Sequence, residues 1–408
     1  MKVQSPLRHK ETRSFRREIY AVDRIARPSR RYGFALLVLA AFIGNSCGAH
    51  SVELATHMRP ESLFMKDHPY GRLYIEIDTV EGVEVPQDWL DHLETFFAEH
   101  ACKPDGIVIA KDEPIPLAEV RDLTVTEASL LYTDGPRETE EQPAYVHVFF
   151  YNLDDGLSAP YETPHVLQPY PNTIFFNMGY QDSVPSCIGR DYLLHEAGHV
   201  LGLCRNKNHG DGSHCRNYNC LMRASTEELS SLARILGTPL GIEFAPVPPC
   251  KDCLGDLEFY KRADLDAGLS FNGPFLVRRQ EKYSVVSLPS CNIIVEPNRV
   301  LDWRNALQSA KTSMMKSVAK RRDTAEAAAR RGESLVAPET TRKAPKKGLG
   351  NNYFFMSVRN GDAPSPAAME RVMAILTAAA EDPNPFVSLS ARVVLKQQAG
   401  DASTQAKP

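Results

Sequence analysis

The stretch HEAGHVLGLC, residues 195–204, holds two histidines four positions apart with a glutamate directly after the first. On an α-helix, His195 and His199 lie one turn apart on the same side, near enough to bind one metal ion. At about 100° per residue, Leu193 and Ala197 lie on the opposite side, where they would pack in the core. The stretch therefore predicts a helix with one metal-binding side and one buried side.

Glu196 and Gly202 extend this pattern. Glu196 lies close to the metal side, where it could take a proton from a zinc-bound water whose pKa zinc lowers to about 7. Gly202 comes three residues after His199, and a residue without Cβ lets the chain turn back toward the ion. A zinc-dependent hydrolase is therefore predicted, although HExxH alone also occurs on helices that simply carry two surface histidines.

The third ligand is expected in the loop that follows, because Arg205 stands ten residues after the first histidine and cannot bind zinc. Glycine and asparagine allow the loop NKNHGDGSHC, residues 206–215, to bend back. The possible ligands in this loop are His209, Asp211 and His214. We favour His214 because Cys215 follows it directly, so that a second site would fix the geometry of the first. The other two residues stay open as alternatives.

Four cysteines form two close pairs, Cys215 with Cys220 and Cys250 with Cys253. Such pairs predict a tetrahedral zinc site. Disulfides within the pairs are the alternative in an oxidising compartment, but a Cys-x-x-Cys disulfide is strained. The cysteines left over within the body of the chain are Cys102, Cys187, Cys204 and Cys291. Cys204 is expected to be a buried apolar residue or a disulfide partner.

The same residues resemble the archaemetzincin family, whose pattern runs His-Glu-x-x-His-x-x-Gly, then His-Cys-x4-Cys-x-Met, then Cys-x-x-Cys. The matching residues here are His195, Glu196, His199, Gly202, His214, Cys215, Cys220, Met222, Cys250 and Cys253. The resemblance implies a catalytic zinc on the three histidines, Glu196 as general base, a Met-turn at Met222 and a structural zinc on the four cysteines. Two spacers depart from the family: eleven residues separate Gly202 from His214 instead of two, and 27 separate Met222 from Cys250.

Strand and helix patterns precede the histidine helix. Apolar residues alternate with polar ones in RLYIEIDTVEG, residues 72–82, which indicates a half-buried strand. A helix follows at 88–100, and further short strands are indicated at 106–110, 144–152 and 172–178. These strands and helices predict an α+β fold. The resemblance implies that this fold is a metzincin-like zincin with a mixed sheet, an active-site helix carrying HExxHxxG and a smaller C-terminal subdomain.

Composition shifts divide the chain into five parts. We predict a basic N-terminus with a signal peptide (1–50), a linker (51–70), a metallopeptidase domain (71–300), a basic helix and linker (301–350), and a short helix with a disordered tail (351–408). The helix in the fourth part has a thin apolar face, so it is expected to be exposed.

Charge and the N-terminal apolar run bear on partners and location. The formal net charge is -4, but residues 51–301 hold 20 basic and 38 acidic residues, which argues against a nucleic-acid-binding core. The apolar run at 34–43 is too short to span a bilayer and matches a signal peptide. We predict an exported protein, secreted or anchored to the membrane through a lipidated Cys47, that acts on a peptide or protein substrate.

The function predicted from the sequence is a zinc-dependent metallopeptidase in which Glu196 activates zinc-bound water. One alternative is a non-catalytic, zinc-stabilised, exported binding module. Another is a gluzincin-type hydrolase, in which the third ligand is Glu227 or Glu228 from the downstream segment TEELSSLARIL.

Overall fold

A computed structural model gives the fold of the chain. The residues that it describes are 61–137, 141–152, 172–179, 185–204, 206, 208–224, 244–262, 268–288, 291–297, 300–331, 353–356 and 366–382, with Ser388, Ala391, Arg392 and Leu395. All of them belong to one compact unit, Leu54–Pro408. The predicted signal peptide and Cys47 lie outside the described residues.

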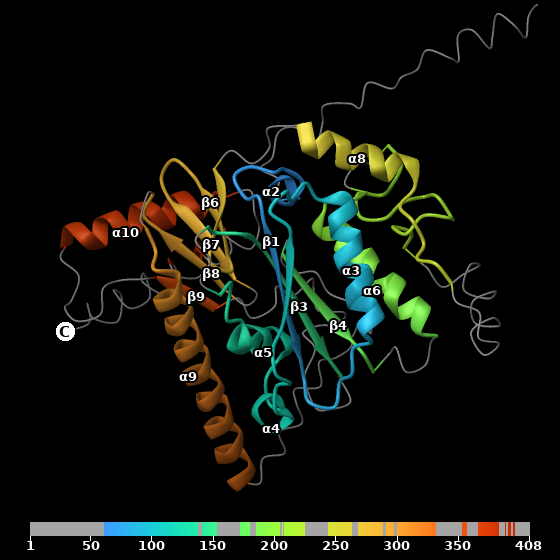
Figure 1. The fold of residues 1–408 in the computed structure, drawn as a ribbon. Helices are drawn as coiled ribbons and strands as arrows, with labels where there is room; N and C mark the ends of the chain where they lie inside the picture. The colour runs from blue at the N-terminus through green and yellow to red at the C-terminus, as the bar shows by residue number, and fades with distance from the viewer. Residues whose placement is uncertain are drawn as a thin grey trace, which may run out of the picture. The chain divides into compact units, whose positions relative to one another are not determined.

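A four-stranded sheet forms the centre of the fold (Figure 1). Its strands are β1 (Leu73–Thr79), β2 (Ile107–Lys111), β3 (Ala144–Tyr151) and β4 (Thr173–Asn177). They lie in the order β2-β1-β3-β4, and each pair is parallel. The strands occur where the sequence predicts them. The prediction of a mixed sheet is wrong for this sheet, because long connections return the chain to the same end before each described strand. The overall architecture is thus mixed α/β, with a parallel sheet and helices.

Helices cover both faces of this sheet (Figure 1). On one face lie α3 (Gln87–His100) and α6 (Ser186–Val200), which pack against each other, and the Trp89 indole donates a hydrogen bond to the Ser186 hydroxyl at 2.9 Å. On the other face lie α4 (Leu117–Val120) and α5 (Val125–Tyr132). The two faces carry separate buried clusters, of which the first includes the apolar side of α6.

Strand β1 is buried along its whole length, so the prediction that it is half-buried is wrong. A parallel sheet between two helical layers has no solvent-facing side, and its polar residues need protein partners. The Glu76 carboxylate accepts hydrogen bonds from the Asp134 and Gly135 amides and from the Tyr145 hydroxyl, each at 2.8 Å. Asp78 on the same strand pairs with buried His147 of β3.

A second sheet follows in the chain and is the mixed one. Its strands are β5 (Leu269–Asn272), β6 (Phe275–Arg279), β7 (Ser284–Leu288), β8 (Cys291–Val295) and β9 (Tyr353–Met356), in that order. The first four are antiparallel neighbours, and β9 runs parallel to β8. Helix α10 (Pro366–Ala379) contacts β8. Both sheets lie in the same compact unit.

Helix α9 (Trp303–Arg330) is the predicted basic helix, and it is anchored rather than exposed throughout. Leu307 and Met314 are buried in the same cluster as α5. The Arg321 guanidinium makes two hydrogen bonds to the Glu127 carboxylate of α5, at 2.7 and 2.8 Å. The thin apolar face is therefore sufficient to hold α9 against the core, because the buried Glu127 carboxylate on α5 supplies a second point of attachment.

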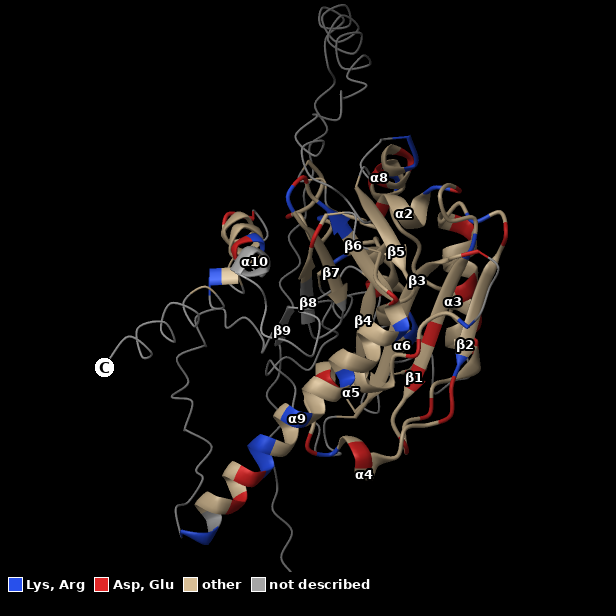
Figure 2. Cartoon of the chain, turned by 90° about the vertical axis from the view of Figure 1, so that its left-hand side faces the viewer, with Lys and Arg blue, Asp and Glu red and all other residues tan. Residues whose placement is uncertain are grey.

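Charged side chains are distributed unevenly over these elements. Figure 2 shows acidic residues on α3 and α4, whereas α9 carries both signs. Within the described part of the chain, every helix is too short or too polar to cross a bilayer.

Candidate metal centre

Helix α6 carries His195, Glu196 and His199. The two histidine rings lie 4.8 Å apart between centroids, on the same side of the helix. Leu193 and Ala197, on the other side, are fully buried in the core. The predicted division of the helix into two sides is present, and the apolar side fixes the orientation of the histidines.

The helix ends in a Schellman motif at Gly202. Gly202 has a φ of 82°, its amide bonds the His199 carbonyl, and the Leu203 amide bonds the Gly198 carbonyl, both at 3.0 Å. A Cβ on Gly202 would stand 2.8 Å from Cγ of Glu61 and 3.0 Å from Cε2 of Tyr260. Both the left-handed backbone and the lack of space therefore require glycine here, as the sequence predicts for the turn.

The segment packed against Gly202 is itself held in place. Glu61 belongs to a short buried helix, α2 (Glu61–Met65), which contacts α8 (Lys251–Arg262). The Lys103 ammonium donates hydrogen bonds to three carbonyls of this region, those of Leu63, Lys66 and Tyr70. This attachment fixes α2 beside the end of α6.

The loop after α6 returns His214 to the two helix histidines. The His214 ring centroid lies 5.4 Å from each of the other two, and one donor nitrogen from each ring lies within 4.8 Å of the others. Asp211 shapes this loop: its carboxylate accepts from the amides of Ser213 and His214, at 2.8 and 2.7 Å. A Cβ on Gly210 would meet the His214 carbonyl oxygen at 2.4 Å, so a close backbone approach requires that glycine.

The alternatives for the third position have other partners. Asp211 is occupied by the loop amides, and these bonds, that of His214 foremost, lower its pKa. The His209 ring pairs with Asp256 of α8 at 2.8 Å and lies with the cysteines, not with the other histidines. Glu227 and Glu228 lie outside the described residues. Among the described residues, His214 is thus the one placed with His195 and His199.

The protonation state of His195 is fixed by its surroundings. Its Nδ1 lies 2.7 Å from the Leu221 carbonyl oxygen. A carbonyl only accepts, so Nδ1 carries the proton and Nε2 keeps its lone pair. Burial, with a smaller contribution from His214, lowers the pKa of the ring to about 4. His195 is therefore neutral at physiological pH, as a metal ligand must be.

Glu196 is partly buried on the same helix. Burial raises the pKa of its carboxyl to about 8. A carboxyl group with a pKa near neutrality can both accept and release a proton under physiological conditions. At pH 7 such a carboxyl is mostly protonated, and a cation bound by the neighbouring histidines would favour the carboxylate form that a general base needs.

Met222 packs beneath the histidine helix. It is fully buried, and a Cβ on Gly198 would lie 2.3 Å from its sulfur, so the side chain contacts the helix backbone between the two histidines. The Met222 carbonyl accepts from the Cys215 amide at 2.7 Å. The position agrees with the Met-turn that the resemblance implies. It also links the residue beneath the histidines, Met222, to Cys215.

The four paired cysteines also gather, with one sulfur from each within 4.8 Å of the others. Cys215 lies 3.6 Å from Cys250, and Cys220 lies 3.5 Å from Cys253, between sulfur atoms. These contacts bring Cys215 and Cys220 together with Cys250 and Cys253, across the residues that separate the two sequence pairs. The alternative disulfides would instead have joined Cys215 to Cys220 and Cys250 to Cys253. Cys215, Cys220, Cys250 and Cys253 are not joined by disulfides.

Backbone amides point at these sulfurs. The Asn217 amide donates to Cys215 and the Met222 amide to Cys220, both at 3.4 Å. Burial raises the pKa of Cys215 to about 11, and the neighbouring thiol of Cys253 raises that of Cys220. Thiols so placed lose their protons only beside a cation, which is the condition of a metal–thiolate site.

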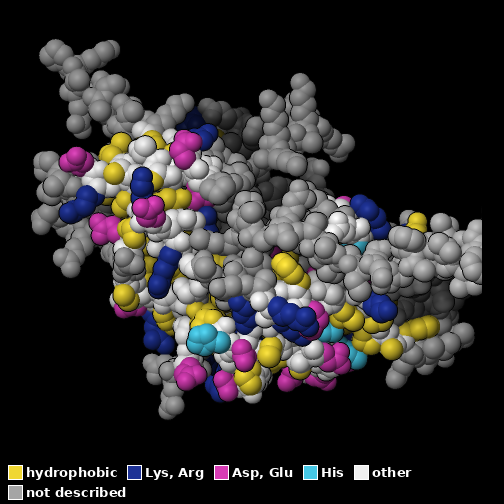
Figure 3. All heavy atoms as spheres, turned by 90° about the horizontal axis from the view of Figure 1, so that it is seen from above, with side chains coloured by type: hydrophobic (Ala, Val, Ile, Leu, Met, Phe, Trp, Pro, Cys, Tyr) yellow, Lys and Arg dark blue, Asp and Glu magenta, His cyan; other side chains and the backbone are white. Residues whose placement is uncertain are grey.

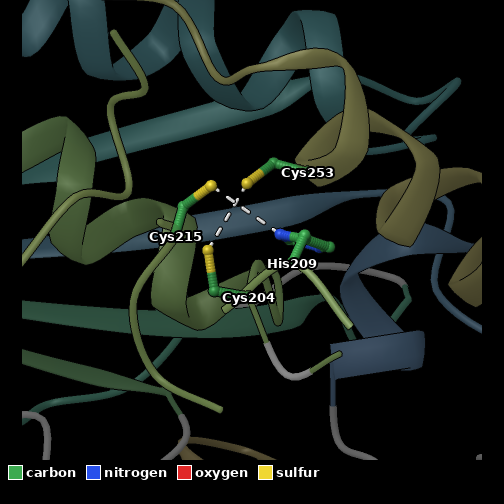
Figure 4. Close-up of side chains that lie close together, drawn as sticks. All are labelled: Cys204, His209, Cys215 and Cys253. Atoms are coloured by element: carbon green, nitrogen blue, oxygen red, sulfur yellow. Dashed lines mark hydrogen bonds between the residues drawn. The ribbon is translucent and has the colours of Figure 1, made fainter. Parts of the chain in front are cut away.

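Two further residues, Cys204 and His209, join this cluster, although the sequence did not predict them there. Cys204, Cys215, Cys253 and His209 form a second group of four possible ligands, and their donor atoms point toward one another (Figure 4). Cys204 was expected to be a buried apolar residue or a disulfide partner; its burial is confirmed, and its sulfur lies among possible metal ligands, 3.4 Å from that of Cys253. The sequence signal for this placement was the position of Cys204 two residues after Gly202, where the chain turns back toward the other cysteines.

The chain has only distant similarity to the known proteins that were found. No family model and no curated protein matches the chain. One solved structure found is archaemetzincin from Methanopyrus kandleri, with 16% sequence identity, a TM-score of 0.28, and coverage of 48% of this chain and 96% of that one. A TM-score this low does not establish a common fold.

Replacement of Gly202 tests the helix end. Gly202→Ala combines a left-handed backbone with contacts below 3.0 Å, and we expect it to lower the free energy of unfolding by roughly 2–5 kcal/mol. Gly82→Ala is the matched control: it has a φ of 89° and open space around the Cβ, so it should cost only about 1–2 kcal/mol. Urea unfolding measures both. Equal losses would show that packing at Gly202 contributes nothing.

Proposed function

We propose that the chain is a zinc-dependent metallopeptidase whose zinc ligands are His195, His199 and His214. The observation that carries this proposal is the convergence of three imidazoles with Glu196 on the same helix. Three neutral nitrogen ligands and an adjacent carboxylate are the set found in hydrolytic zinc sites, which leave the fourth position for water or substrate. The fold proposed is that of a metzincin-like zincin.

The tautomer of His195 and the packing of its helix both fit a bound zinc ion. Nε2 of His195 has its lone pair free because Nδ1 donates to the Leu221 carbonyl. Met222 and the buried side of α6 prevent the helix from moving away from the loop. A zinc ion there would polarise a peptide carbonyl and lower the pKa of a water molecule.

Glu196 performs the proton transfer in the proposed reaction. Its carboxylate oxygen accepts a proton from the attacking water and donates that proton to the amine that leaves, so that the peptide carbonyl carbon gains one C–O bond and loses its C–N bond. The burial that raises its pKa also excludes bulk water, which would otherwise compete for the proton.

The substrate class follows from the surroundings of the histidines. His214 is one-third exposed, so this ligand is reachable from solvent. Figure 3 shows histidine, acidic, basic and apolar side chains intermingled on one face of the molecule, without a large uniform patch among the coloured residues. The acidic body favours neutral or basic peptides by electrostatic steering.

We also propose that the protein is exported, either secreted or anchored through a lipidated Cys47, as its N-terminus predicts.

The proposal is tested by Glu196→Gln. We expect kcat/KM for a peptide-library substrate to fall about 10²–10⁴-fold, because the general base is lost. Zinc content should stay at the wild-type level, since Glu196 is not a ligand. Glu94→Gln, an exposed change on α3, is the control and should keep full activity. A wild-type protein that holds zinc but hydrolyses no peptide would support the alternative of a non-catalytic binding module.

The third ligand is tested by His214→Ala. We expect this variant to lose about one zinc ion per chain and all hydrolysis, while the cysteine cluster keeps its metal. His92→Ala on α3 is the control and should change neither. The measurement is elemental analysis of the purified chain after dialysis. Full zinc content in His214→Ala would contradict the assignment and favour a ligand from the segment that contains Glu227 and Glu228.

A further inference from the structure

The cysteine cluster contains more ligands than one metal ion can use. Six side chains take part: Cys204, His209, Cys215, Cys220, Cys250 and Cys253. They form two groups of four, and both groups contain Cys215 and Cys253. A zinc ion takes four such ligands in a structural site. One ion would therefore leave two ligands of this buried cluster without a metal.

The spacing within both groups fits tetrahedral zinc. With Zn–S bonds of about 2.3 Å, neighbouring sulfurs of a regular tetrahedron lie about 3.8 Å apart. In the group with Cys204 and His209, the sulfurs of Cys204 and Cys253 lie 3.4 Å apart, and Nδ1 of His209 lies 3.7 Å from the Cys215 sulfur. In the group with Cys220 and Cys250, the sulfur pairs lie 3.5 and 3.6 Å apart. A disulfide would require about 2.05 Å.

His209 is oriented as a ligand by its other ring nitrogen. Nε2–H donates a hydrogen bond to the Asp256 carboxylate at 2.8 Å, so Nδ1 keeps its lone pair and faces the Cys215 sulfur. The Asn206 amide holds the second oxygen of Asp256 at 3.2 Å. Zinc-binding histidines usually donate their other ring N–H to a carboxylate in this way. Asp256 is buried, so this hydrogen bond lies inside the protein and not at its surface.

Cys204 is held in a conformation that needs an explanation. Its φ is 65°, and it is the one non-glycine residue with positive φ among the described residues. Cysteine is not a residue that favours this region, and the cost is typically repaid by a specific function. The conformation places its sulfur 3.4 Å from Cys253 in a fully buried position.

Charge favours two ions over one. Four thiolates around one zinc ion carry a formal charge of about −2 in a buried place, beside a further thiol and a histidine. Five thiolates, one neutral imidazole and two zinc ions carry about −1. Two four-coordinate ions that share two bridging ligands need six protein ligands, which is the number present.

We propose that Cys204, His209, Cys215, Cys220, Cys250 and Cys253 hold a two-zinc thiolate cluster in which Cys215 and Cys253 bridge the ions. One ion takes Cys204 and His209 as its other ligands, and the second takes Cys220 and Cys250. On binding, each of the five thiols releases its proton to solvent, and no electron is transferred. The insertion between Gly202 and His214 then has a structural role, because it supplies the two additional ligands.

Cadmium-113 NMR of the full chain tests this directly, since Cd²⁺ binds the same ligands. We expect two resonances in the thiolate region, coupled to each other through the bridging sulfurs. A histidine-bound ion resonates far from this region, so failure of the proposed peptidase site would be seen separately. A single thiolate resonance, or two without mutual coupling, would overturn the proposal.

Zinc content of a double variant gives a second test. Cys204→Ser with His209→Gln should lose one zinc ion per chain and keep the other cluster ion, while the exposed Cys102→Ser should lose none. Circular dichroism checks that both variants are folded. An unchanged zinc content in the double variant would show that the four paired cysteines hold a single ion. If the double variant fails to fold, the NMR spectrum of the wild-type chain decides the matter.

Discussion

The end of helix α6 at Gly202 is the constraint on which both candidate metal sites depend. With a φ of 82° and no room for a Cβ, this residue follows the last helical residue, Val200, and the Leu201 cap, and it reverses the chain. A helix that continued would carry the following residues away from the histidines at 1.5 Å per residue. Because it stops, Cys204, His209 and His214 all return to the neighbourhood of α6.

The two groups of ligands are joined by short covalent and hydrogen-bonded links. His214 precedes Cys215 directly in the chain. The Leu221 carbonyl that fixes the His195 tautomer lies between Cys220 and Met222, and the Met222 carbonyl bonds the Cys215 amide. Metal in the cysteine cluster would therefore rigidify the residues that orient the histidines. For the proposed metallopeptidase, the cluster is a structural support, and the proposed chemistry belongs to the histidines and Glu196.

Much of the histidine helix could be predicted from sequence because its signals are local. The spacing of His195 and His199, the apolar residues opposite them and the glycine at the turn all lie within a few residues of one another. The choice of His214 rested on its neighbour Cys215 and on a family resemblance, and the loop geometry set by Asp211 was not predictable. Cys204 and His209 were missed as cluster members because their partners, Cys253 and Asp256, lie about 50 residues away. The parallel direction of the first sheet and the burial of Glu76 likewise depend on connections and helical layers far along the chain.

Anomalous diffraction at the zinc absorption edge, from crystals of the full chain, would locate the metal ions directly. We expect one peak bounded by His195, His199 and His214, with Glu196 near it but not bonded to it. A histidine site whose peak is bonded by a glutamate from the 225–243 segment instead of His214, or the lack of a peak between the histidines in protein that contains zinc, would contradict the account.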